Sequence, residues 1–184
     1  MRIGLLGGSF NPAHDGHLHA SLVALKGLKL DYVWWLVSPQ NPLKPVRGMA
    51  GLEARLAGAR KLARNRRIIT TDIESGFGTV YTVDTLIALQ RRFPHAHFVW
   101  LMGSDNLLQL PRWRRWQEIV GMIPVAVVAR PGTALKARTC EVAGKLGRRI
   151  RPAGGAFARC PAPALTMLDA RRNPNSATRL RDVG

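Results

Sequence analysis

The sequence predicts an α/β protein with a single Rossmann-like domain over residues 1–184, in which helices cover both faces of a doubly wound, mostly parallel sheet. Short apolar runs typical of strands alternate with segments whose apolar residues recur at helical spacing. Strands separated by helices of about ten residues or more are typical of βαβ units, whose right-handed crossovers cover both faces of the sheet. With 184 residues, of which 46% are hydrophobic, the chain is long enough for one domain with a substantial core.

Six apolar runs are predicted as strands. They are Ile3–Leu6, Tyr32–Val37, Arg67–Thr70, His97–Met102, Val125–Ala129 and Ala164–Leu168. Apolar residues at helical spacing predict helices between them, in the series Leu18-Leu22-Leu25, Leu52-Leu56-Ala59-Leu62-Ala63 and Val83-Leu86-Ile87-Phe93. The basic, glycine-containing segment 136–159 is predicted as one helix followed by a loop.

The sequence contains no signal for export or membrane insertion. Its longest apolar run, Ile123–Ala129, has the length of a strand and not of a membrane span. The first strand begins at Ile3, which leaves no room for a signal peptide. Cys140 and Cys160 have nineteen residues between them, lack metal-ligand spacing and are expected to be free thiols. We therefore expect a cytoplasmic protein that binds no membrane.

The net charge is strongly positive, because 28 Lys and Arg residues against 11 Asp and Glu give +17. Such a balance suits anionic partners, either nucleic acid or phosphorylated metabolites. No nucleic-acid motif is present, although a basic nucleic-acid-binding domain remains an alternative to an enzyme. We assign most of the excess to the exposed surface, since many arginines lie outside any motif: Arg55, Arg60, Arg64, Arg66 and Arg67.

Ligands of a doubly wound sheet bind beyond the carboxyl ends of its strands, so the segments that follow the strands are the candidate sites. The first reads Gly7-Gly-Ser-Phe-Asn-Pro-Ala-His-Asp-Gly-His17. Gly7, Gly8 and Pro12 predict a turn, and a helix is expected to open from about Ala13. Backbone N–H groups and the positive helix end together make an anion site.

Two histidines, His14 and His17, lie three positions apart and are expected on one face of the first helical turn. A metal site is not predicted from this pair. His19 lies on another face, and neither Glu nor Cys occurs at ligand spacing.

The string Gly-Gly-Ser-Phe-Asn-Pro-x-His-x-Gly-His resembles the signature of the His-x-Gly-His nucleotidyltransferases, and its longer form is similar to nicotinate-nucleotide adenylyltransferases. The resemblance implies that His14 and His17 are catalytic. It implies ATP contacts from Gly7, Gly8, Ser9 and Phe10, and a substrate contact from Asn11.

Later segments resemble the same family. Lys44 ends a loop stiffened by two prolines and is expected to contact phosphates. Thr82 and Thr85, in Thr-Val-Asp-Thr-Leu, match a segment beside the pyridine mononucleotide. Asp105, in Gly-Ser-Asp, follows the fourth strand and is expected at the ATP ribose.

Two tryptophans follow, of which Trp116 is expected in the core. Trp113 corresponds to the family's tryptophan that stacks on nicotinate. The next residue is Arg114, where some relatives carry tyrosine. The chain closes on a segment similar to Ser-Ser-Thr-x-x-Arg, in which Ala177 replaces one serine and the expected ATP ligands are Ser176, Thr178 and Arg181.

The resemblance implies adenylyl transfer from ATP to nicotinate mononucleotide, giving deamido-NAD and pyrophosphate. The attacking phosphate is already ionised at neutral pH, since its second pKa is about 6. The protein therefore has to align the two substrates and neutralise their charge. Mg²⁺ is expected to enter with ATP, held mainly by phosphates and water. Nicotinamide mononucleotide or phosphopantetheine as acceptor are the alternatives. The oligomeric state is left open, and a homo-oligomer is compatible with the sequence.

Overall fold

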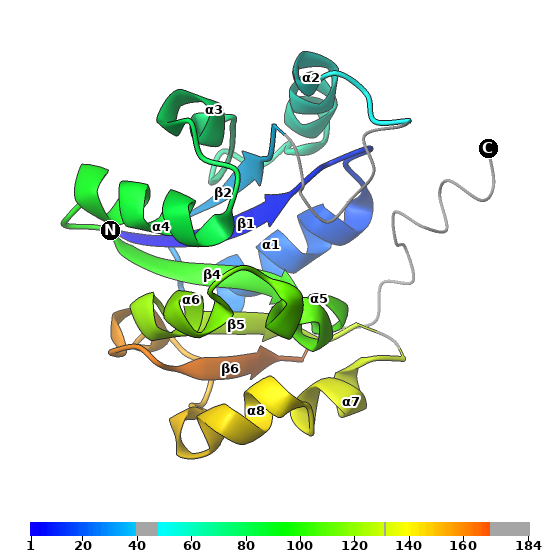
Figure 1. Ribbon diagram of the computed structural model, residues 1–184. Helices are drawn as coiled ribbons and strands as arrows, with labels where there is room; N and C mark the ends of the chain where they lie inside the picture. Colours follow the sequence, from blue (N-terminus) through cyan, green and yellow to red (C-terminus); the bar gives the residue numbers. More distant parts are fainter. Residues whose placement is uncertain (40–47, 131, 170–184) are drawn as a thin grey trace.

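The computed structural model describes residues 1–39, 48–130 and 132–169. Its centre is a six-stranded sheet in the order β3-β2-β1-β4-β5-β6, with every neighbouring pair parallel (Figure 1). The strands are β1 (Arg2–Gly8), β2 (Tyr32–Val37), β3 (Ile68–Thr71), β4 (His97–Gly103), β5 (Val125–Val128) and β6 (Leu165–Leu168). All six predicted strands are confirmed, within two residues at each end.

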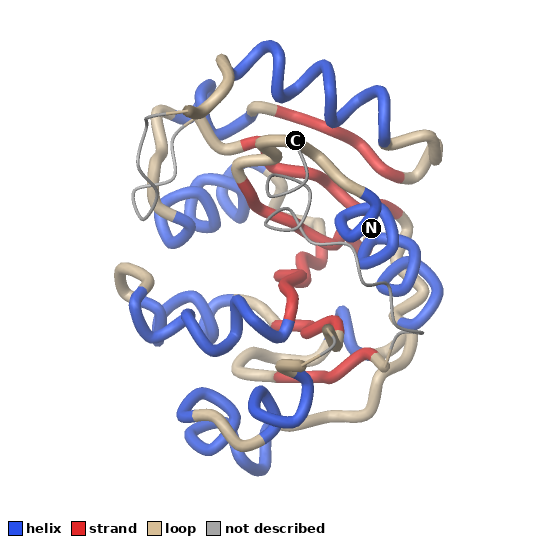
Figure 2. The backbone as a smooth tube through the Cα atoms, turned by 90° about the vertical axis from the view of Figure 1, so that its right-hand side faces the viewer, coloured by secondary structure: helices blue, strands red, loops and turns tan. Residues whose placement is uncertain are grey.

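Helices lie on both sides of this sheet (Figure 2). They are α1 (Asp15–Gly27), α2 (Leu52–Leu62), α3 (Ile73–Phe77), α4 (Thr82–Arg92), α5 (Ser104–Gln109), α6 (Trp116–Met122), α7 (Ala134–Arg138) and α8 (Glu141–Leu146). Short 3-10 helices occur at Leu110–Arg112, Gly147–Arg149 and Phe157–Arg159. The predicted doubly wound α/β fold is therefore confirmed.

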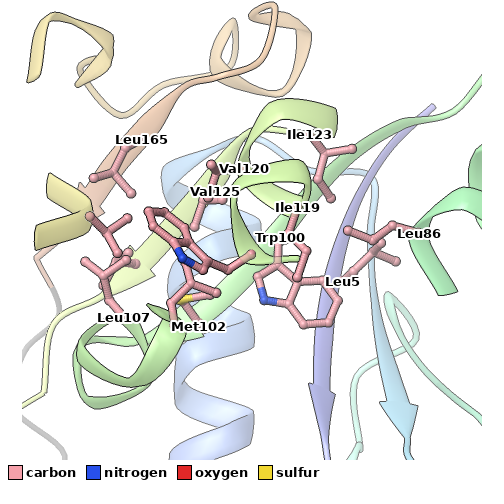
Figure 3. Close-up of a cluster of buried hydrophobic side chains, with 14 of the residues drawn as sticks. Leu5, Leu86, Trp100, Met102, Leu107, Ile119, Val120, Ile123, Val125 and Leu165 are labelled. Atoms are coloured by element: carbon pink, nitrogen blue, oxygen red, sulfur yellow. The ribbon is translucent and has the colours of Figure 1, made fainter. Parts of the chain in front are cut away.

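The alternation of side chains along each strand gives the protein two hydrophobic clusters, one on each face. In β4, Phe98, Trp100 and Met102 enter one cluster, whereas Val99 and Leu101 enter the other. The first cluster is covered by helices α3 to α8, and the second by α1 and α2. Figure 3 shows part of the first cluster, where strand side chains meet α4 and α6.

The segment 136–159 differs from the expected single helix and loop. Helix α7 ends before Cys140, which adopts an extended conformation and begins α8. Gly147, at φ 32°, ends α8 after Leu146. The break lets Ala137 of α7 and Leu146 of α8 both reach the core, which a continuous helix along this sheet edge would not do.

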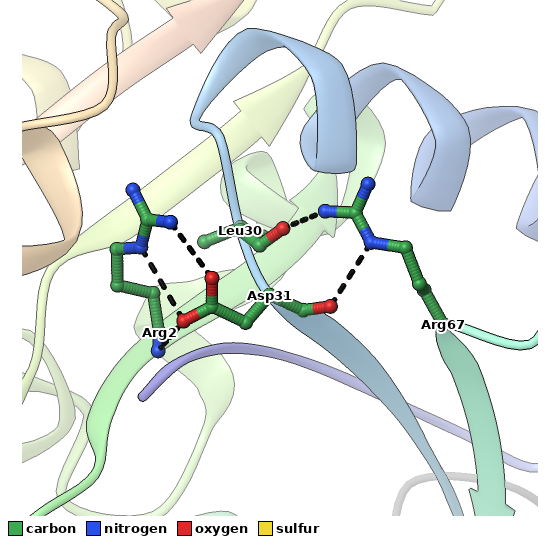
Figure 4. Close-up of polar contacts among 4 residues, drawn as sticks. All are labelled: Arg2, Leu30, Asp31 and Arg67. Atoms are coloured by element: carbon green, nitrogen blue, oxygen red, sulfur yellow. Dashed lines mark hydrogen bonds and ion pairs between the residues drawn. The ribbon is translucent and has the colours of Figure 1, made fainter.

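At the amino ends of β1 and β2, polar contacts join the starts of three strands (Figure 4). Arg2 binds the Asp31 carboxylate through its backbone N–H at 2.7 Å and its Nη2 at 2.7 Å. The Arg2 guanidinium lowers the pKa of Asp31 to about 2. Arg67 lies on the exposed surface, as predicted, and its guanidinium donates to the carbonyls of Leu30 and Asp31.

Candidate active site

The connection after β1 leads to β2 on one side, and the connection after β4 leads to β5 on the other side. The strand order therefore reverses between β1 and β4. In such sheets the ligand site lies beyond the carboxyl ends of the strands at this switch point. The segment after β1 and the segment after β4 both begin there. Most of the sequence-predicted site residues that the structure describes lie on these two segments or on their neighbours.

The glycine pair is not part of the turn. Gly7 and Gly8 are the last residues of β1 and pair with Leu36 and Val37 of β2. The turn comes later, at residues 9–14, and its positive φ of 47° belongs to Phe10. Gly7 serves close packing instead, because a Cβ there would lie 2.7 Å from Cη2 of Trp100, whereas a Cβ on Gly8 would make ordinary contacts with the Phe10 ring.

The two signature histidines lie against each other at the start of α1. Their ring centroids are 3.9 Å apart, as expected for one helix face. His14 is the N-cap, and its Nδ1 accepts from the backbone N–H of Gly16 at 3.1 Å. His17 Nδ1 in turn accepts from the backbone N–H of His14 at 3.2 Å.

These contacts determine which ring nitrogen carries the proton. A nitrogen that accepts a hydrogen bond holds no proton, so in the neutral rings of His14 and His17 the proton lies on Nε2. Both side chains can then donate a hydrogen bond to an anion next to the positive end of α1. The helix start thus combines a dipole with two N–H donors.

Buried hydrogen bonds from Trp35 in β2 hold the start of α1, which carries the histidine pair. The indole Nε1 of Trp35 donates to Ser21 Oγ at 2.7 Å, and Ser21 Oγ donates to the His17 carbonyl at 2.8 Å. The Phe10 ring contacts both His17 and Trp35, at centroid distances of 4.6 Å and 5.1 Å. Because the Phe10 side chain is buried, any ATP contact from this residue comes from its backbone.

Arg55 is a residue of this region that the sequence did not reveal. It is 4% exposed and donates to the carbonyls of Ser9 at 2.6 Å, Ser38 at 2.8 Å, Pro39 at 3.0 Å and Ala50 at 2.9 Å. Burial lowers the pKa of its guanidinium. Its assignment to the exposed surface was therefore wrong, and helical spacing in α2 was the only available signal of its burial.

Asn11 links the same loops from the other side. Its Nδ2 donates to the Gly48 carbonyl, and its Oδ1 accepts from the Ala50 backbone N–H, both at 3.3 Å. The segment after β1 is thereby tied to the start of α2 through Asn11 and Arg55. Lys44, expected to contact phosphates, lies outside the described residues.

The α4 start is supported by Glu74, a second residue that the sequence did not reveal. The Thr85 hydroxyl donates to Glu74 Oε1 at 2.9 Å and lies 2.9 Å from Thr79 Oγ1. Burial raises the pKa of Glu74, and hydrogen bonds from Thr85 and Ser38 oppose that rise. Thr85 is fully buried, which differs from the expected contact with substrate and gives it a supporting position.

At the start of α4, two backbone N–H groups have no hydrogen-bond partner within the described residues. The N–H groups of Asp84 and Thr85 bind the Tyr81 carbonyl at 3.0 Å and 3.1 Å. Those of Thr82 and Val83 have no hydrogen-bond partner within the described parts of the chain. Val83 is fully buried, so an anion at this helix end would meet the N–H group of the partly exposed Thr82.

The segment after α5 reaches the α4 start. Trp113 is half-buried and meets Trp100 edge to face, with centroids 6.1 Å apart. The guanidinium carbon of Arg114 lies 4.5 Å from the centroid of the Tyr81 ring. Trp100 thus contacts Trp113 and closely approaches Gly7, and it connects the two expected ligand regions. Trp116 is buried in the core, as predicted.

Asp105 lies in the first turn of α5, at the end of β4. Its Oδ2 pairs with Nη1 of Arg130 at 3.1 Å, and its buried Oδ1 has no partner among the described residues. Ser104 Oγ accepts from the Arg130 backbone N–H and lies 2.6 Å from Thr133 Oγ1. Arg130 was not among the predicted site residues, although it follows β5 directly in Ala129-Arg-Pro-Gly132, a segment that also resembles the family.

The closing motif is not described. Ser176, Thr178 and Arg181 lie outside the described residues, so their ATP contacts stay predictions. In residues 1–39, 48–130 and 132–169 there is no group of three or more His, Cys, Asp or Glu side chains that could hold a metal ion. None of the helices in these ranges has both the length and the apolar character of a membrane span.

Comparison with known proteins assigns the family. Residues 5–183 match the family described as cytidylyltransferase-like. The chain belongs to this cytidylyltransferase-like family. Among its relatives is a nicotinate-nucleotide adenylyltransferase of Parvibaculum lavamentivorans, 55% identical over 187 residues that cover 100% of this chain and 92% of the relative. One of the same name from Gluconobacter oxydans is 50% identical over 186 residues, covering 100% and 95%.

A solved structure supports the fold of this cytidylyltransferase-like protein. The nicotinic acid mononucleotide adenylyltransferase of Plasmodium falciparum, in complex with NaAD, matches with a TM-score of 0.65. The match covers 96% of this chain and 77% of that protein at 16% sequence identity. The same architecture is therefore reached with few residues in common.

Proposed function

We propose that this protein transfers the adenylyl group of ATP to nicotinate mononucleotide, giving deamido-NAD and pyrophosphate, and that residues 1–184 act as one domain. The observation that carries the proposal is the pair of adjacent rings of His14 and His17 at the positive end of α1, beside the switch point of the sheet. Full-length identity of 55% and 50% to nicotinate-nucleotide adenylyltransferases supports the assignment of the substrates.

The proposed adenylyl transfer requires little proton transfer. The acceptor phosphate attacks the α-phosphorus of ATP, the bond to the bridging oxygen breaks, and pyrophosphate leaves with the electron pair. Because the nucleophile is already ionised, the protein has to align two polyanions and neutralise charge. The Nε2–H groups of His14 and His17 are suited to donate to the transferring phosphoryl group, since the N-cap contacts fix their proton position.

ATP is proposed to lie over the end of β1 and toward α5. The backbone of residues 7–10 faces the triphosphate, and Asp105 accepts from a ribose hydroxyl through its unpartnered Oδ1. Lys44 and the closing residues Ser176, Thr178 and Arg181 add phosphate ligands in this proposal. Mg²⁺ enters as part of the nucleotide substrate, bound chiefly by phosphate oxygens and water.

Nicotinate mononucleotide is proposed to lie between the α4 start and Trp113. The indole offers a flat face for the pyridine ring, and the N–H group of Thr82 at the positive helix end can receive an anion. In this arrangement Asn11 lies between the two nucleotides. Its side-chain amide also binds residues 48 and 50. Both substrates are phosphorylated, so we infer a cytoplasmic location.

The experiment is pyrophosphate release from MgATP with each acceptor in turn. Nicotinate mononucleotide is expected to give the highest kcat/KM, nicotinamide mononucleotide a lower value, and phosphopantetheine none. Turnover with phosphopantetheine alone would contradict the proposal. Salt-sensitive binding of nucleic acid without turnover of ATP would favour the basic binding domain instead.

A further inference from the structure

Two adjacent arginines, Arg114 and Arg115, lie before α6 and contact the start of α4 in different ways. The Arg114 guanidinium rests on the Tyr81 ring, with its central carbon 4.5 Å from the ring centroid. Nη1 of Arg115 lies 3.4 Å from Oδ1 of Asp84. Tyr81 is the N-cap of α4 and Asp84 belongs to its first turn.

The charge of Arg115 is already neutralised. Its guanidinium binds both oxygens of Glu118, at 2.8 Å and 2.6 Å, in addition to Asp84. Its backbone is in the left-handed region, at φ 52°, as the N-cap of α6. Arg115 therefore fixes the loop against α4 and has little capacity left for a ligand.

The charge of Arg114 has no such partner. Within the described residues it forms no ion pair, and its side chain is exposed except for the contact with Tyr81. A cation on an aromatic ring at an exposed site is held weakly, so its N–H donors remain available to an anion. Arg114 is thus a positive charge without an acidic partner among the described residues, and the Tyr81 ring on which it lies precedes the unpartnered N–H group of Thr82.

We propose that Arg114 is a specificity-determining residue, whose guanidinium binds the ring carboxylate of a pyridine mononucleotide that stacks on Trp113. This inference rests on the proposed function and deepens it. The Tyr81 ring holds the guanidinium at the edge of the acceptor site, and the N–H group of the partly exposed Thr82 adds a second donor for the carboxylate.

The chemistry of the two acceptors explains why an arginine would discriminate between them. A carboxylate presents two anionic oxygens that match the parallel N–H groups of a guanidinium. A carboxamide presents one neutral oxygen, and its NH₂ group turns two donors toward a cation. Arg114 should therefore favour the acid, whereas the stacking face of Trp113 is indifferent to the difference.

The test compares kcat/KM for nicotinate and nicotinamide mononucleotide in the wild type, Arg114→Gln, Arg114→Lys and the control Arg112→Gln. Arg112 is exposed and has no ion pair or hydrogen bond from its side chain within the described residues. The acid-to-amide ratio is expected to fall about tenfold or more in Arg114→Gln, because a charge-assisted hydrogen bond is lost. Arg114→Lys should retain part of the ratio, and Arg112→Gln all of it.

The ratio of two substrates on one protein sample is insensitive to partial misfolding, which lowers both values alike. An unchanged ratio in Arg114→Gln, with a wild type that prefers the acid, would overturn the inference and leave the proposed function standing. A wild type that uses neither pyridine nucleotide would overturn both.

Discussion

The guanidinium of Arg55 donates a 2.6 Å hydrogen bond to the carbonyl of Ser9, 46 residues earlier in the chain. The same nitrogen, Nη1, also donates to the Ser38 carbonyl at 2.8 Å. One buried side chain of α2 thus joins the segment after β1 to the segment after β2. These are the segments on which ATP contacts are proposed, so their relative position depends on a residue that we expect to contact no phosphate.

We predict that Arg55→Met destabilises the protein by about 2–4 kcal/mol, since buried carbonyls lose charged donors. The KM for ATP should rise as well, because the two segments lose their common anchor. Urea denaturation and initial rates measure the two effects. Arg55→Lys should recover only part of each, as an ammonium cannot reproduce the planar fork.

Arg60 provides the matched control for Arg55, because it lies on the exposed side of the same helix. Arg60→Met should leave both stability and the KM for ATP near the wild-type values. Equal effects of the two substitutions would show that removal of any α2 cation has these consequences, and that the contacts of Arg55 with the loops do not matter.

We predict that His17→Ala lowers turnover about 10²- to 10³-fold with a modest change in ATP affinity, since one donor to the transition state is removed. His17→Asn should lose turnover similarly, although its amide oxygen can still accept from the His14 N–H. Single-turnover rates and equilibrium ATP binding separate the effects. The exposed His95→Ala serves as control, and near-normal turnover of both His17 variants would contradict the assignment.

Glu74 is predicted to make stability depend on pH. Its folded pKa is raised, so the folded state binds the proton more readily, and stability falls as the pH rises from the unfolded pKa through the folded one. Glu74→Gln has no such titration and keeps an acceptor for Thr85. Its stability relative to the wild type should therefore be greatest at alkaline pH and should decrease with acidification, in denaturation curves between about pH 4 and pH 8.

Asp31 is predicted to act in the opposite direction. Its folded pKa of about 2 lies below the usual value, so its pairing with Arg2 stabilises the protein above about pH 4 and is lost as the pH falls toward 2. Solvent screening of this exposed pair limits the contribution to about 1 kcal/mol. Asp31→Asn should cost this amount at neutral pH and progressively less as the pH falls through about 2, in denaturation curves recorded over this range.

The strands and the longer helices could be predicted because their signals are local. The apolar run before Gly7 and the helical spacing of Val83 and Leu86 reflect burial on one strand or one helix face, whatever the partner is. The ordered motif around His14 and His17 also lies in one stretch of sequence, so their common helix face followed from their spacing alone.

The remaining features depend on residues far apart in the chain. Gly7 is required at the end of β1 because the Trp100 ring occupies the space of a side chain there, and Leu36 is its ladder partner. Thr85 turns inward because its hydroxyl donates a hydrogen bond to Glu74. Neither partner can be inferred from glycine or threonine themselves. The doubly wound fold and the histidine site could therefore be predicted from local sequence patterns. The environments of Gly7, Arg55 and Thr85 depend on the tertiary structure, because only the folded sheet brings the distant donors, acceptors and rings into contact with them.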